Sequence, residues 1–119
     1  MATKFKTIFN KQIAAFFTDI IAAYPEEKQF RSLKTQINMA IMMDDEIAIK
    51  YFYEYLTTQY KTQIYKKDEK FFLSFDLSGT PLGHLNRLKD VFKSAPKGTQ
   101  TTIWKYVIVL AKLSEKYYS

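Results

Sequence analysis

The chain has 119 residues and no cysteine, and its 18 Lys and Arg exceed its 12 Asp and Glu by a net charge of +6. This composition excludes a disulfide framework, a cysteine nucleophile and a Cys-ligated metal site, and the lone His84 excludes a multi-histidine centre. The length is that of one domain, so we expect a single helical domain over residues 1–119. No apolar stretch reaches a membrane span and the first residues lack a secretion signal's apolar core, so we expect neither a span nor secretion.

Three helices are predicted in the first half of the chain. Apolar residues recur every three to four positions over 4–24, which indicates an amphipathic helix that ends at Pro25. Pro25 can open a second helix in its first turn, where the acidic residues 26–27 would face the helix dipole favourably. The acidic residues 44–46 precede a further apolar run, as capping residues do, so a third helix is predicted to about Tyr60.

The segment 61–77 has only short apolar clusters. Asp68 is placed to cap one helical turn over 69–73. A strand over 71–75 is the alternative, but a short helix or an extended segment is favoured because no second strand is evident to pair with it.

Two more helices are predicted in the last third. Thr80 and Pro81 are a cap and a first-turn residue for the fourth long helix. The run 95–98 ends that helix, and Thr99 is expected to cap the last one, whose residues 103–113 are almost all apolar. The fold class is therefore predicted to be all-α, a single compact bundle of five or six helices around the last one.

No catalytic, cofactor or metal site is predicted. The acids 44–46 and 68–69 could bind a divalent cation, but consecutive acids at a helix start point in different directions, so capping is the preferred interpretation. His84 has no neighbouring nucleophile, and the segment 78–83 lacks the spacing of a phosphate loop. Trp104 could stack on bases, but its apolar helix favours a place in the core. We expect no enzyme activity.

Five of the six net positive charges fall in residues 79–119. This segment would make any contact with an anionic partner, and a nucleic-acid-binding module is the alternative function. Sequence-specific DNA reading is not expected, because 16 of the 18 cations are Lys, which lacks the fork of Arg. The residues expected on phosphates are Arg87, Lys89, Lys93, Lys97 and Lys105.

Aromatic residues are unusually frequent, at 17% of the chain. Tyrosines are common in protein interfaces because they bury large area and still reach a hydrogen-bond partner. We expect exposed tyrosines to act as anchors for a protein partner, a richly packed core being the alternative for any one of them. The candidates are Tyr51, Tyr53, Tyr55, Tyr117 and Tyr118.

Several segments carry a resemblance that spans most of the chain. They are FNKQI at 9–13 with Phe16 and Phe17, AYPE at 23–26, KDEKFF at 67–72, and IWKY at 103–106 leading into LAKLS at 110–114. Together they resemble small helical proteins of large nucleocytoplasmic DNA viruses. The resemblance implies a virus-encoded, non-enzymatic structural protein, a minor capsid or virion-associated component whose partners are other virion proteins, located in the virion or inside the host cell. It implies no active-site residues.

Overall fold

The computed structural model describes residues 3–80 and 83–119, and within these ranges the side chains of all residues except Leu73 and His84. Its regular structure is helical, and no strand occurs in the described ranges. None of the described helices is long and apolar enough to cross a membrane. The elements are α1 (Thr3–Ala23), α2 (Lys28–Met43), α3 (Ile47–Phe52), the π-helical η1 (Tyr53–Thr57), α4 (Thr58–Tyr65), α5 (Lys70–Ser74), the 3₁₀ turn η2 (Gly83–Asn86), α6 (Arg87–Ser94) and α7 (Lys97–Tyr117).

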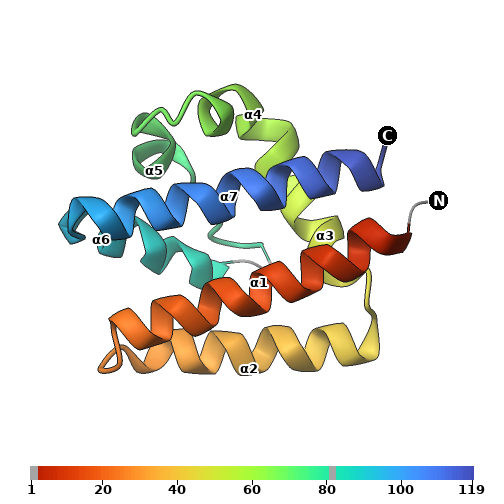
Figure 1. Ribbon diagram of the computed structural model, residues 1–119, viewed down its shortest axis with the longest axis horizontal. Helices are drawn as coiled ribbons and strands as arrows, with labels where there is room; N and C mark the ends of the chain where they lie inside the picture. Colours follow the sequence, from red (N-terminus) through yellow and green to blue (C-terminus); the bar gives the residue numbers. More distant parts are fainter. Residues whose placement is uncertain (1–2, 81–82) are drawn as a thin grey trace.

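The two longest helices, α1 and α7, pack side by side and run in opposite directions (Figure 1). In the same view α2 lies along the other side of α1, and α4 and α5 lie across α7 from α1. Because α3, η1 and α4 follow one another without a gap, they form one continuous helix, and the described chain then contains six helices. The predicted all-α bundle of five or six helices is confirmed.

The core is rich in aromatic rings, and α7 supplies its centre. Ile103 and Leu110 are completely buried, and Trp104 is only 6% exposed. Phe72 stacks on Phe92 with ring centroids 4.0 Å apart, and both rings lie edge-on to Trp104. Trp104 is therefore a core residue, as its apolar helix predicted, and the alternative of a base-stacking platform is wrong.

Two predicted helix starts differ from the structure. The last helix begins at Lys97, with Pro96 extended just before it, so Thr99 lies inside the helix and does not cap it. The second helix begins after Glu27, so Pro25 lies in the connecting turn and not in the first helical turn.

The third helix is longer than predicted and is kinked. It continues through a π turn to Tyr65, with a non-helical backbone at Tyr60 (φ −126°, ψ 17°). The chain leaves it by a left-handed residue, Lys67 (φ 53°). The following segment agrees with expectation: the backbone N–H of Lys70 donates to Asp68 Oδ1 at 3.0 Å, and the helical turn α5 leads into an extended Phe75.

The fourth long helix of the prediction is divided into the turn η2 and the regular helix α6. The predicted first-turn position, Pro81, lies outside the described residues. Asn86 joins the two parts to the preceding loop, because its Oδ1 accepts the N–H of Leu77 at 3.0 Å and its Nδ2 donates to Asp76 at 3.1 Å.

Candidate protein-contact surface

An apolar groove of about 240 Å³ lies between α2 and α3. Its apolar side chains come mainly from one face of each of these two helices, and its described lining contains no Asp, Glu, Lys or Arg. Such a concave apolar surface offers dispersion and desolvation energy to a partner but no acid or base for catalysis. The residues of the two helices that line it are Leu33, Gln36, Ile37 and Ala40 of α2 and Ile47, Ala48, Tyr51 and Phe52 of α3.

Three methionines on the outer side and at the C-terminal end of α2 expose further apolar surface to solvent. Met39, Met42 and Met43 are 60%, 86% and 89% exposed, the three highest values among the large hydrophobic side chains described as exposed. Met43 follows the groove residue Ala40 by three positions, so both lie on neighbouring parts of the same helix surface. Methionine is flexible and polarisable, and it is common on surfaces that adapt to protein partners. We call the groove and these methionines the α2 surface.

Sequence reasoning did not identify the α2 surface, although a signal for it exists. Residues 35–43 (TQINMAIMM) are nine consecutive uncharged residues, six of them apolar. A helix at the edge of a bundle buries only one stripe, so a segment with apolar residues around most of its circumference leaves some of them in solvent.

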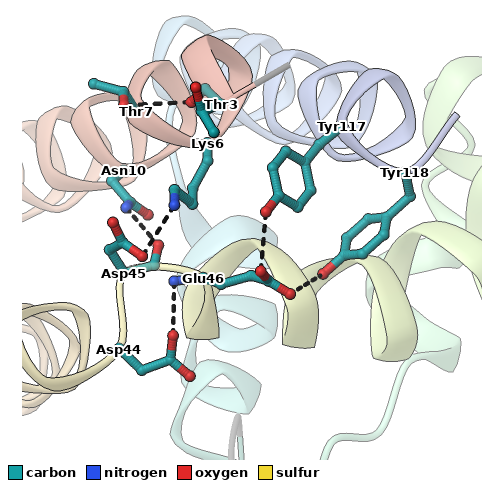
Figure 2. A network of polar contacts seen from close by, with 9 residues as sticks. All are labelled: Thr3, Lys6, Thr7, Asn10, Asp44, Asp45, Glu46, Tyr117 and Tyr118. Carbon is teal, nitrogen blue, oxygen red and sulfur yellow. Dashed lines mark hydrogen bonds and ion pairs between the residues drawn. The ribbon is translucent and has the colours of Figure 1, made fainter. Parts of the chain in front are cut away.

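The acidic run at the α2–α3 corner has structural partners (Figure 2). Asp44 Oδ1 accepts the backbone N–H of Glu46 at 3.1 Å and so closes the turn before α3, but the N-cap residue Glu46 makes no side-chain capping hydrogen bond. Asp45 forms an ion pair with Lys6 at 3.0 Å, and its backbone carbonyl accepts Asn10 Nδ2 at 2.9 Å. In the described chain no group of three or more His, Asp or Glu side chains is arranged to hold a metal ion.

The third acid of this corner binds the end of α7. Tyr117 and Tyr118 donate their hydroxyls to the two carboxylate oxygens of Glu46, at 3.0 and 3.4 Å (Figure 2). Burial is the main reason that the pKa of Tyr117 is raised. Burial, and then the charge of Glu46, raises the pKa of Tyr118 to about 12. Both hydroxyls therefore stay protonated as donors at neutral pH.

The five candidate tyrosines do not form one exposed patch. Tyr117 is 4% exposed, so the expectation that it is an exposed anchor is wrong: its ring packs against the core while its hydroxyl reaches Glu46. Tyr118 is half-buried and stacks on Tyr53 with centroids 4.6 Å apart. Tyr51 and Tyr55 are half-buried, and their ring centroids are 5.9 Å apart. Among the five, Tyr51 is the one that lines the groove.

The five cations predicted to bind phosphates also do not form one exposed group. Arg87 forms ion pairs with Glu27 and with Asp90 (3.2 Å), which raises the pKa of its guanidinium, and Lys89 lies over the ring of Phe75 at 4.9 Å. These two cations have intramolecular roles. The other three, Lys93, Lys97 and Lys105, are exposed.

A lysine face does exist on α7, but its members differ from the predicted ones. Lys105, Lys112 and Lys116 are exposed and are spaced by seven and four residues, which places them on one side of the helix. Lys116 also lies over the ring of Phe5, with its Nζ 5.7 Å from the ring centroid. Lys112 and Lys116 were not among the residues assigned to phosphate contacts.

Comparisons of the chain with models of protein families, with curated proteins and with solved structures found no match.

Proposed function

We propose that this protein is a non-enzymatic interaction module that works by binding other proteins through the α2 surface. The observation that carries the proposal is that α2 presents both an apolar groove and three highly exposed methionines. Exposed apolar surface costs free energy in water, and on a folded protein it is typical of a site that a partner covers. Tyr51 contributes to the groove as a tyrosine anchor of the expected kind.

The virus-encoded, virion-associated role belongs to the same proposal and is supported by the sequence resemblance. A capsid-associated protein needs a surface for neighbouring proteins and needs no active site, and the α2 surface meets the first requirement. Mass spectrometry of purified particles tests this part. Absence of the protein from particles, while it is abundant in infected cells, would make the virion assignment wrong and would leave the interaction module standing.

A photo-cross-linking amino acid at position 42 tests the interaction itself. Met42 is 86% exposed, so replacing it leaves the core unchanged. We expect covalent adducts with protein from position 42, and far fewer from the same group at Thr101, which is exposed on α7. Equal adduct formation at the two positions would contradict the proposal.

The alternative function, nucleic-acid binding, is favoured by one observation, the lysine face of Lys105, Lys112 and Lys116. Three phosphate contacts would make the logarithm of duplex-DNA affinity fall with the logarithm of salt concentration with a slope of about −3. Replacing Lys112 with Gln should reduce that slope by about one. No binding at low salt, or binding insensitive to salt, would eliminate this function.

A further inference from the structure

The exposed side of α2 carries a regular seam. Five exposed residues, Lys28, Ser32, Thr35, Met39 and Met42, follow one another at spacings of four, three, four and three. This alternation is the spacing by which one helix packs along another at a small crossing angle. The seam lies on the side of α2 that points away from the core, and in Figure 1 α2 forms one edge of the molecule.

Charge is distributed along α2 in three blocks. The first seven residues, 28–34, hold three cations and no acid, residues 35–43 hold no charge, and residues 44–46 are all acidic. Lys28 at one end and Asp44 at the other are both exposed, and neither forms an ion pair with another described residue. In an antiparallel pair of copies, Lys28 of each copy is therefore placed toward Asp44 of the other.

Side-chain sizes along the seam also fit an antiparallel pair of copies. If two copies of α2 cross antiparallel with a twofold axis level with Ile37, Met39 lies level with Thr35 of the other copy and Met42 with Ser32. Each of these layers then pairs a long flexible side chain with a short one, as close packing requires. In the same register Lys28 comes near Asp44 of the other copy, whereas Asp45 and Glu46 already bind Lys6 and the hydroxyls of Tyr117 and Tyr118. A parallel pair would place cation beside cation and acid beside acid.

We propose that a second copy of this chain covers the exposed side of α2, in an antiparallel and symmetric α2–α2 contact. This inference rests on the proposed function, because it names a partner for two exposed methionines of the α2 surface, Met39 and Met42. No residue of the seam lines the groove. The contact is isologous, so each copy provides the methionines that pack on the other copy's Ser32 and Thr35.

The expected strength of this contact follows from its size. A 16-residue helix is about 24 Å long, and a single helix pair of that length buries less than the roughly 800 Å² per partner of a standard stable interface. The dimer is therefore weak and reversible in dilute solution, and it becomes strong when other contacts hold many copies together.

Sedimentation velocity of the whole chain, from about 1 μM to about 1 mM, tests self-association. We expect the monomer fraction to fall as concentration rises, and we expect Met42→Lys to move the transition at least tenfold to higher concentration. Thr101→Lys, which adds the same charge at an exposed position of α7, should leave the transition in place. A chain that is monomeric throughout, or a dimer that Met42→Lys does not weaken, would overturn the proposal.

Cross-linking tests the direction of the helices, because the natural chain has no cysteine to interfere. In the antiparallel register the two copies of residue 35 are about 6 Å apart along the helix axis and the two copies of residue 28 about 27 Å. A short bismaleimide should therefore join Thr35→Cys chains to each other far more efficiently than Lys28→Cys chains. Equal efficiency at the two positions would show a parallel or a different contact and would overturn the arrangement.

Failure of this inference is distinguishable from failure of the proposed function. A monomeric chain whose position 42 still cross-links to a different protein overturns the α2–α2 contact only. A chain that dimerises as described and forms adducts solely with itself supports the contact and makes the chain its own partner.

Discussion

At the scale of single residues, Trp104 is the largest side chain in the core and meets three phenylalanine rings. Replacing it with alanine removes this packing and leaves a cavity, so we expect the free energy of unfolding to fall by about 3–5 kcal/mol. Urea denaturation followed by circular dichroism measures this loss. Thr101→Ala, one turn earlier on the exposed side of α7, should change stability by less than about 0.5 kcal/mol. A similar effect of the two substitutions would place Trp104 outside the core.

Tyr118 provides a pH-dependent prediction. Its pKa is raised from 10.0 to about 12 in the folded chain, so folding favours the protonated phenol. The stability that this provides is complete below pH 10, where the unfolded chain also holds the proton, and it is lost as the pH rises towards 12. Tyr118→Phe cannot ionise. The stability of the natural chain should therefore decline more steeply over this range than that of the variant, as measured by urea denaturation at several pH values, and parallel curves would contradict the burial of Tyr118.

At the scale of elements, a buried hydroxyl pair connects the π turn η1 to α7. Thr57 and Ser114 are 1% and 0% exposed, and their hydroxyl oxygens are 2.8 Å apart. Ser114 donates its single proton to the carbonyl of Ala111 at 2.7 Å, so Thr57 is the donor of the pair. A π turn inserts one residue into a helix, and here it places a polar side chain of α3–α4 inside the core.

The direction of this hydrogen bond makes the two substitutions unequal. Ser114→Ala leaves the Thr57 hydroxyl buried without an acceptor and should cost about 1–3 kcal/mol. Thr57→Val leaves Ser114 bonded to Ala111 and should cost less. In the double variant both polar groups are gone, so its loss should be smaller than the sum of the two single losses. Additive losses in denaturant unfolding would show that the pair does not act as a unit.

The C-terminal end of α4 gives a stabilising prediction. Lys67 has φ 53°, and the N–H groups of Lys67 and Asp68 donate to the carbonyls of Ile64 and Gln63 at 3.1 and 2.9 Å. This is the Schellman arrangement, in which glycine is preferred at the left-handed position. We expect Lys67→Gly to raise the free energy of unfolding by up to about 1 kcal/mol. Lys66→Gly, at an ordinary helical φ of −84°, should lower it, and a loss at both positions would contradict the prediction.

At the scale of the whole molecule, stability is distributed unevenly between the long helices and the segment that joins α4 to α6. The helices α1 and α7 are 21 residues each and pack along their length. In contrast, α5 has five residues and η2 has four, so they contain few intrahelical hydrogen bonds. Amide hydrogen exchange should be slowest in the middle of α1 and α7 and fastest over residues 70–80. Uniform exchange across these segments would contradict this distribution.

Local sequence patterns specify the helical class, most of the helices and much of the core. Periodic apolar positions are a local property, because a stripe at three-to-four-residue spacing has to face the core wherever the helix lies. Phe9, Ile13 and Trp104 are buried for this reason. The turns that Asp44 and Asp68 close before α3 and α5 also depend on local sequence, since each aspartate accepts an N–H two residues further along the chain.

Only the tertiary structure decided which of the remaining side chains meet solvent. The sequence marks Tyr117 as an apolar ring with a polar tip, but its burial depends on where Glu46 lies after the chain has turned back, 71 residues away. The same holds for Arg87, whose ion pair with Glu27 spans 60 residues. Met39 and Met42 are exposed because α1 and α3 cover the other sides of α2. Exposure depends on contacts between distant segments, and periodicity within one segment does not specify which side of a helix another helix will cover.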